Sequence, residues 1–528
     1  MTSRNRNHRS AATRLSAVLV VALGASQATL LFAQATAPPA AGGDAAAASA
    51  PAGSDAAARD AILKALTVET LIGDAVSLSN QAYPEVDNAI KRFINGDLAG
   101  AREFLEVAKT KYPKLPPTDL TLAKMQVIVR NGQAARAFLE KAVTDNPGDP
   151  EAYLLLADLA FVEGRVTEAH ALFEKANGLT ASFAENEKRK LNFTERVLAG
   201  LAAIHERRLQ WAEAAALLQK WIAIKPDSAV AHQRLGATLY RLQKPTEALA
   251  EFTKARETDA NSNHPQVWLG QLYTQDKKVP EARKAFEAAY AAEPANEGTA
   301  RAYAEWLIQQ NDMANAQKVA AAMRAKAPAS VTAILLDGVV AKMRRQNKEA
   351  EEALTKVLTL EPNNSIATNL LALILSEDKA SSASLERALG YAQRNAALFP
   401  NATQTKITLA WVLYQMGRLT EANQVLSQGL QNPSADGAYL IARIMEAQSQ
   451  KDKAAALLQE VLNQAGAGVF LYRTEAEALL NKLKAEGVVV PVTSAPTTPG
   501  ATTTPAPPAG GPAPAVTTPP AAAPTAGS

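Results

Sequence analysis

The sequence contains no cysteine in 528 residues. This absence excludes disulfide bonds, thiol catalysis, cysteine-held metal sites and a lipid-modified cysteine near the N-terminus. Aromatic residues make up only 5% of the chain and glycine contributes 27 residues, a composition that favours helices built on alanine and leucine. The hydrophobic fraction of 47% is still enough to bury a long core.

Patterns typical of catalytic and metal sites are also missing from the sequence. After the first 35 residues no two histidines lie at i and i+4 beside an acidic third ligand. The histidines of this part are His170, His205, His232 and His264. The stretch AGAGVF at 465–470 resembles a phosphate loop only superficially, because it lacks the lysine and a preceding strand. We therefore expect no catalytic residue, no metal ion and no cofactor.

Residues 1–35 have the three parts of an export signal. Four arginines give a positive start, an apolar run follows at 17–25, and an Ala-Gln-Ala cleavage site ends at Ala35. We expect a mature chain that begins near Thr36 and is periplasmic or extracellular, with an uncleaved membrane anchor as the alternative. Cleavage removes four basic and no acidic residues, so the remaining chain is nearly neutral and has no overall charge that would attract nucleic acid. No later segment is apolar enough for a membrane span.

Two low-complexity segments flank the rest of the chain. Residues 36–58 are mostly Ala, Pro and Gly, and residues 487–528 are mostly Pro, Ala, Thr and Gly with no charged residue. Neither segment has enough apolar surface to offset the entropy lost on ordering. We expect both to be disordered, the second as an extended spacer with partial polyproline II character.

Between these segments the sequence repeats with a period of 34 residues. RLGATLYRLQKPTEALAEFTKA at 234–255 and WLGQLYTQDKKVPEARKAFEAA at 268–289 share Leu-Gly, Tyr, Pro, Glu-Ala, Phe and Ala in nearly the same places. Each unit contains two apolar stripes at helical spacing, which predicts two helices. Small residues at two positions, such as Gly270 and Ala282, allow the two helices to approach closely, and Phe286 fills the space between them.

These marks resemble the tetratricopeptide repeat family. The resemblance implies an all-α, right-handed superhelical solenoid of antiparallel helix pairs, and extending the template gives about eleven units. The predicted organisation is a capping helix at 59–81, units 1–3 at 82–183, an insertion at 184–194, units 4–11 at 195–467 and a second capping helix at 468–486. The insertion fits a hinge or a lengthened helix equally well.

In that family, four positions of each first helix line a concave groove that holds extended segments of partner proteins. Spacing supports a shared face, because steps of three and four residues return to the same side of a helix. The candidate partner-binding residues are Gln233, Arg234, Tyr240, Arg241, Gln271, Thr274, Trp411 and Tyr414. Arg234 and Arg241 would favour an acidic segment. Packing between repeats is the alternative role for the aromatic pair Trp411 and Tyr414.

The sequence therefore predicts a non-catalytic protein-interaction scaffold of the cell envelope. Its expected partners are other proteins, bound through peptides or extended segments. The first alternative is a component of an envelope assembly, polysaccharide-export or secretion complex. An accessory subunit of an enzyme is a further alternative, and a passive spacer whose groove binds nothing is another.

Overall fold

The computed structural model describes residues 65–76, 78, 81–377, 381–427, 433–464 and 470–488. The predicted signal peptide, the linker at 36–58 and the tail beyond residue 488 lie outside the described residues. Within the described ranges all regular structure is helical and no strand occurs. No helix in this part of the chain combines the length and the apolar character needed to cross a bilayer.

Eleven consecutive helix pairs form the described array. The first helices of the pairs are α5 (Pro84–Ile94), α7 (Thr118–Ile128), α9 (Pro150–Val162), α11 (Glu187–Arg207), α13 (Ala229–Arg241), α15 (Pro265–Gln275), α17 (Glu297–Gln309), α19 (Val331–Met343), α21 (Ser365–Glu377), α23 (Thr403–Gln415) and α25 (Ala435–Ala447). The second helices are α6 (Leu98–Lys111), α8 (Gly132–Asp145), α10 (Val166–Ser182), α12 (Trp211–Ile224), α14 (Pro245–Thr258), α16 (Val279–Ala292), α18 (Met313–Lys326), α20 (Asn347–Leu360), α22 (Ser382–Leu398), α24 (Leu419–Leu426) and α26 (Lys451–Gln464). The short helix α4 (Val68–Ile72) precedes them and α27 (Arg473–Ala485) follows them.

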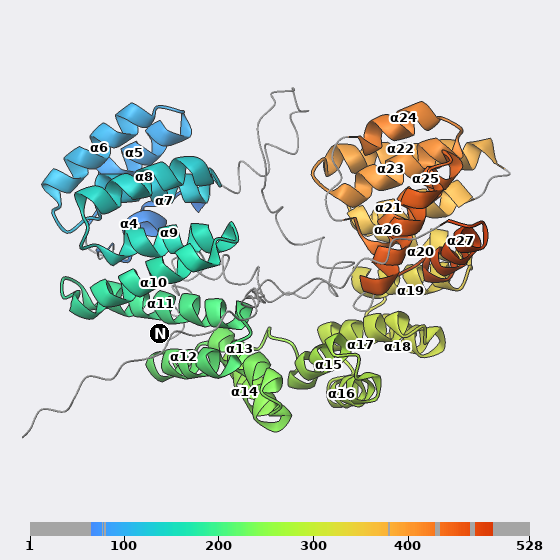
Figure 1. Ribbon diagram of the computed structural model, residues 1–528, viewed down its shortest axis with the longest axis horizontal. Coiled ribbons are helices and arrows are strands. Elements are labelled where there is room, and N and C mark those ends of the chain that lie inside the picture. The colour runs from blue at the N-terminus through green and yellow to red at the C-terminus, as the bar shows by residue number, and fades with distance from the viewer. Residues whose placement is uncertain are drawn as a thin grey trace, which may run out of the picture.

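The array bends into an open horseshoe in Figure 1, with α4–α11 in one arm and α19–α27 in the other. At the base of the bend, the first helices α13 and α15 lie on the inner side and the second helices α14 and α16 lie on the outer side. We call the surface formed by the first helices the inner face. The predicted all-α solenoid of helix pairs is confirmed for the described residues.

The repeat marks act as predicted at the contact between the two helices of a pair. Phe286 of α16 packs against Gly270 of α15, and a Cβ atom at Gly270 would lie 2.9 Å from the Phe286 ring. Gly236 of α13 and Phe252 of α14 repeat this contact one unit earlier, with 2.7 Å to the ring. Glycine is therefore needed at both positions because the phenylalanine ring occupies the space of a side chain.

The turn between the two helices of a pair needs one residue in the left-handed backbone region. Glycine fills this position in some units, as at Gly96 and Gly164, with φ values of 81° and 79°. Other residues fill it elsewhere, with φ between 58° and 63°: Arg130, Leu209, Gln243, Lys277, Asn311, Arg345 and Ser449. A side chain makes this conformation unfavourable by roughly 1–2 kcal/mol. The fold therefore carries local backbone strain at several of its turns.

Replacing Leu209 by glycine is expected to stabilise the protein. Its side chain is 66% exposed, so little burial is lost, and its φ of 59° suits glycine better. The expected gain is about 0.5–1 kcal/mol, because the greater entropy of unfolded glycine offsets part of the relief. Leu209→Ala is the control, since it removes the side chain but keeps the Cβ atom. Thermal unfolding followed by circular dichroism tests this, and equal melting of the two variants would contradict it.

The predicted insertion at 184–194 mostly extends a helix, and the described part of the predicted first capping helix contains only a short one. Residues 187–194 form the first two turns of α11, which has 21 residues, and α10 before it has 17 residues. Most other helices of the array have 11 to 14 residues. At the start of the array, the helix within the described part of 59–81 is mainly the five-residue α4.

Candidate functional site

The N-terminal end of the inner face is covered by the segment 65–76, which contains α4. Leu71 and Ile72 of this segment are 0% and 1% exposed, and they belong to one buried cluster with Val86 and Ile90 of α5. Lys124 of α7 donates a hydrogen bond to the Leu71 carbonyl oxygen at 3.1 Å. This part of the inner face is therefore occupied by the protein's own chain.

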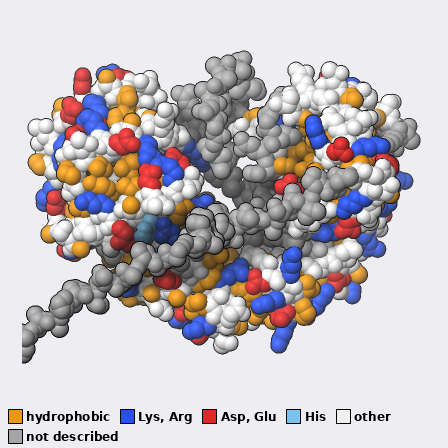
Figure 2. Space-filling model, in the orientation of Figure 1, with side chains coloured by type: hydrophobic (Ala, Val, Ile, Leu, Met, Phe, Trp, Pro, Cys, Tyr) orange, Lys and Arg blue, Asp and Glu red, His pale blue; other side chains and the backbone are white. Residues whose placement is uncertain are grey.

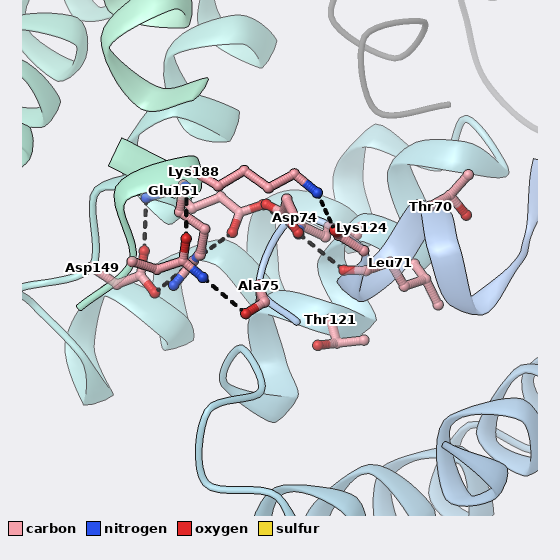
Figure 3. A network of polar contacts seen from close by, with 12 residues as sticks. Thr70, Leu71, Asp74, Ala75, Thr121, Lys124, Asp149, Glu151 and Lys188 are labelled. Atoms are coloured by element: carbon pink, nitrogen blue, oxygen red, sulfur yellow. Dashed lines mark hydrogen bonds and ion pairs between the residues drawn. The ribbon is translucent and has the colours of Figure 1, made fainter. Parts of the chain in front are cut away.

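A buried network of charges lies beside this segment (Figure 3). The Glu151 carboxylate, on the first turn of α9, pairs with the Lys124 ammonium and accepts a hydrogen bond from Arg189 Nη2 at 2.7 Å. The Glu151 side chain is only 3% exposed. Arg189 also pairs with Asp149 at 3.3 Å, and its guanidinium lies over the Phe193 ring, 4.9 Å from the ring centre. Three helices, α7, α9 and α11, are thus connected by charge.

The network holds Glu151 in its charged form. Burial by itself raises the pKa of this carboxyl group, but the adjacent positive charges of Lys124 and Arg189 outweigh it and lower the pKa to about 2. Burial likewise lowers the pKa of Arg189, and Glu151 and Asp149 outweigh it and raise that pKa above its ordinary value. Each charge in the network therefore depends on the others.

The C-terminal end of the inner face is also covered by the protein's own chain. Phe470 and Tyr472, which precede α27, are buried in one cluster with Trp411 of α23 and Tyr439 of α25. The rings of Tyr439 and Tyr472 stack at 5.1 Å between centres. Asp436 of α25 accepts a hydrogen bond from the Tyr472 backbone N–H at 3.2 Å. Burial raises the pKa of the Asp436 carboxyl group to about 7.

The predicted aromatic site at Trp411 and Tyr414 lies in this covered region. Trp411 is 5% exposed, and its ring contacts that of Tyr414 at 5.5 Å between centres. The indole nitrogen of Trp411 has no hydrogen-bond partner among the described residues. Tyr414 is half-buried. These contacts show that the two rings pack between units. Partner binding by the two aromatic residues stays a prediction.

The central stretch of the inner face, on α13, α15 and α17, carries the other candidate residues. Gln233 and Gln271 are partly exposed, and neither side-chain amide makes a hydrogen bond within the described part of the chain. The Thr274 hydroxyl, in contrast, donates to the Gly270 carbonyl oxygen at 2.7 Å. Ala237, between the positions of these residues along the face, is also partly exposed. The two glutamines are therefore the candidate side chains with uncommitted polar atoms.

Tyr240 and Arg241 bind the next unit of the array. The Tyr240 hydroxyl donates to Asp276 Oδ2 at 2.8 Å, and Arg241 Nη1 lies 2.6 Å from Asp276 Oδ1. Arg241 Nη2 also donates to Gln275 Oε1 at 2.9 Å. Tyr240 is only 3% exposed, and burial together with the hydrogen bond to Asp276 raises the pKa of its hydroxyl well above the ordinary value. Both side chains connect α13 to the end of α15.

Arg234 has a similar structural arrangement. Its guanidinium makes two hydrogen bonds to the Glu206 carboxylate, at 3.2 and 2.9 Å, and a third to the Ala199 carbonyl oxygen at 3.0 Å. It also lies over the Trp221 ring, 5.8 Å from the ring centre. The positive charges of Arg234 and Arg241 are therefore compensated by carboxylates of neighbouring units.

Such pairs recur between successive first helices. Arg196 of α11 pairs with Asp158 of α9 at 2.7 Å, and Lys342 of α19 pairs with Glu377 of α21. Within α17, Arg301 lies 3.4 Å from Glu305, and burial raises the pKa of Glu305 to about 7 despite this pairing. Basic and acidic side chains are likewise intermixed over the face seen in Figure 2. In each of these pairs on the inner face, a positive side chain is balanced by a negative one.

The histidines fill structural positions. The buried His232 ring bonds to Glu251 at 2.6 Å and to the Pro226 carbonyl oxygen at 3.0 Å. The rings of His170 and His205 meet edge to face at 6.0 Å. No three His, Asp or Glu side chains of the described ranges are grouped as metal ligands would be.

Sequence reasoning did not identify the buried network of Lys124, Glu151 and Arg189. One signal was present: Lys124 and Glu151 occupy groove positions of neighbouring units, where opposite charges would lie close together. Arg189 belongs to the insertion at 184–194, for which the 34-residue template gives no position. Its place depends on the extension of α11 through that insertion.

Comparison with known proteins identifies the repeats. Family models described as tetratricopeptide repeat match residues 130–181 and 234–297. No protein of curated function matches the chain. Among solved structures, a tetratricopeptide repeat protein from Parabacteroides merdae is 14% identical and has a TM-score of 0.38, covering 48% of this chain and 98% of its own. Yeast Tom70 is also 14% identical, with a TM-score of 0.36, covering 76% of this chain and 96% of its own.

Both family matches fall on helix pairs of the array, the first on α8–α10 and the second on α13–α16. The glycine–phenylalanine contact occurs in both units of the second match, and the left-handed turn recurs in both matches and in neighbouring units. The chain contains tetratricopeptide repeats.

Proposed function

We propose that this protein is a non-catalytic scaffold that binds an extended segment of a partner protein along the central inner face, on α13, α15 and α17. The fold in general supports a protein-interaction scaffold. The observation that favours the central stretch is the pair of uncommitted amides of Gln233 and Gln271, which lie between two ends covered by the protein's own segments.

Amide side chains match the chemistry of an extended backbone. Each glutamine offers donors and an acceptor, and an extended segment has peptide N–H and C=O groups that need partners. The partly exposed Ala237 leaves space for a main chain to approach. Because Arg234 and Arg241 already pair with Glu206 and Asp276, the proposed ligand is uncharged or of mixed charge, rather than the acidic segment that the sequence favours.

The proposed location is the cell envelope. Its support is the arginine-rich start, the apolar run and the cleavage pattern of residues 1–35. A role within an envelope assembly or export complex is compatible with this location. The experiment described next also determines whether residues 1–35 are retained.

Photocrosslinking in intact cells tests the proposed groove. A photoreactive residue at Ala237 is expected to give a partner adduct, and the same residue at the exposed Gln219 of α12 is the outward-facing control. Gln233→Ala combined with Gln271→Ala is expected to lower the yield from Ala237 at least about tenfold, because loss of about 1.4 kcal/mol of binding has that effect. Gln219→Ala should leave the yield unchanged.

Two outcomes would count against the proposal. An identical adduct pattern from Ala237 and Gln219 would remove the inner face as the binding surface. An unchanged yield in the double variant would remove the two glutamines. Mass spectrometry of the adduct gives its first residue, and Thr36 is expected.

A further inference from the structure

The segment 65–76 contacts the array in the way a bound peptide would. Side chains of two other elements donate hydrogen bonds to three of its carbonyl oxygens (Figure 3). The bonds run from Lys124 Nζ to the Leu71 oxygen at 3.1 Å, from Lys188 Nζ to the Gly73 oxygen at 2.8 Å, and from Asn186 Nδ2 to the Ala75 oxygen at 3.0 Å. These donors lie on α7 and at the start of α11.

The three accepting carbonyls lie at and just after the end of α4. The last carbonyl groups of a helix have no partner within the helix, and positive charge near them is favourable. Two of the donors are lysine ammonium groups, and the third is an amide. The three side chains therefore form a site whose chemistry suits the C-terminal turn of a helix.

Apolar contact gives the site its second requirement. Leu71 and Ile72, from the last turn of α4, are fully buried against the cluster of the first two units. Asp74, just after α4, lies 3.8 Å from Lys124. A ligand for this site thus needs two adjacent large apolar residues followed by free carbonyl oxygens and a carboxylate.

The α4 helix has only five residues, a length at which an isolated helix is unstable in water. The eleven helix pairs that follow contain their own buried contacts between first and second helices. We propose that the surface formed by α5, α7 and the start of α11 is a second binding site, for the C-terminal turn of a short apolar helix, and that residues 65–76 are its reversibly bound internal ligand. This site is separate from the central stretch and does not depend on the proposed function.

Release of the segment would change the charge of the site in a defined way. Asp74 would leave, and Lys124, Lys188 and Arg189 would remain with Glu151 and Asp149. The vacated surface would then carry one more positive than negative side chain within this group. That balance favours another helix C-terminus with an acidic residue, so a partner helix of this kind would compete with residues 65–76.

Thiol labelling of the full chain tests the proposal, because the natural sequence has no cysteine to interfere. Ala75→Cys places a thiol in the segment at a position that is 5% exposed, and Ala89→Cys places one in the array at a position that is 0% exposed. Reversible release predicts that the thiol at 75 reacts much faster than the thiol at 89. Addition of a synthetic peptide of residues 65–76 is expected to accelerate the reaction at 75 further, in a saturable way, by keeping the site filled while the internal segment is free.

Asn186→Asp supplies a matched variant. Asn186 Oδ1 caps α11 by accepting from the Arg189 N–H at 3.1 Å, and aspartate retains that role but cannot donate to the Ala75 oxygen. We expect labelling at 75 to accelerate about tenfold, as loss of one hydrogen bond would allow. Asn186→Ser, a capping residue without charge, should act in the same direction. Labelling at 89 should not change in either variant.

Two results would overturn the proposal. Equal labelling rates at 75 and 89 would show that the segment opens only when the array unfolds. A peptide of residues 65–76 that carries Leu71→Ala and Ile72→Ala is the control. If the natural peptide accelerates labelling at residue 75 no more than this control does, the site does not exchange its occupant.

Discussion

Replacing Glu151 by glutamine is expected to destabilise the N-terminal arm by about 3–5 kcal/mol, because removal of one partner leaves buried charges uncompensated. Glu151 is the shared partner of the Lys124 ammonium and the Arg189 guanidinium, and its own side chain is 3% exposed. Glutamine has nearly the same shape, so the change removes charge with little change of packing. The loss should be confined to the helices that these three residues connect.

The positions of the tryptophans allow unfolding of the N-terminal arm to be measured separately from unfolding of the rest of the array. All five tryptophans lie at residue 211 or later, so the arm up to α11 contains none. In Glu151→Gln, circular dichroism should show part of the helix signal lost at lower temperature, while the tryptophan fluorescence transition stays in place. Glu103→Gln, at an exposed position of α6, is the control and should melt as the natural protein does. A simultaneous shift of both signals would show that the arm is not an independent unit.

The pH dependence of the same effect has a fixed sign. The pKa of Glu151 is lowered from 4.5 to about 2 in the folded protein, so its contribution is fully present above about pH 4.5 and disappears as pH falls toward 2. The difference in stability between natural protein and Glu151→Gln should therefore be large at pH 6 and should narrow steadily below pH 4.5. A difference that does not vary with pH would point to lost packing rather than lost charge.

The second large effect is expected at Gly200 of α11. A Cβ atom there would lie 2.3 Å from Cζ of Phe173, a fully buried ring of α10, so Gly200→Ala forces the ring or the helix to move. The expected cost is about 1–3 kcal/mol, the usual range for overpacking a core. Gly178→Ala in α10 is the matched control, because its Cβ atom would meet nothing within 4 Å. There the change should stabilise the helix by about 0.5–1 kcal/mol.

A double-mutant cycle separates crowding from other causes. Phe173→Leu removes the ring, so Gly200→Ala should cost less in that background than in the natural protein. The measurement is thermal unfolding followed by circular dichroism, because this contact also lies in the part of the array without tryptophan. Additive effects of the two changes would mean that the ring is not the obstacle.

The fold was predictable because the residues that define it lie close together in the sequence and recur from unit to unit. Leu-Gly, Phe and Ala at constant spacing define two apolar stripes per unit, and each unit contacts mainly its neighbours. Because the prediction relies on repetition, it could not decide between a hinge and a lengthened helix at 184–194, since an insertion has no counterpart in other units. The structure places most of these residues in a longer α11, where the backbone hydrogen bonds of a helix are satisfied without a new turn.

The candidate site was predictable only as a face. Periodicity places Gln233, Tyr240 and Gln271 on one side of the first helices, but it does not say which side chains already have partners. Tyr240 bonds to Asp276, a residue just beyond the next first helix, and this pairing depends on how far the two units are rotated. The two glutamines are uncommitted because no charged residue of a neighbouring unit reaches them among the described residues.

The ion pairs between successive first helices also bear on the mechanics of the array. Asp158 with Arg196, Glu206 with Arg234, and Asp276 with Arg241 each join two adjacent units on the inner wall. We expect a solenoid of this kind to deform elastically, and ion pairs on its inner face resist its extension more than ion pairs on its outer face would. Dissolved salt screens partly exposed ion pairs, so the stiffness of the array decreases as ionic strength rises. A segment that bridges two neighbouring first helices would act in the opposite direction and stiffen the coil at the place where it binds.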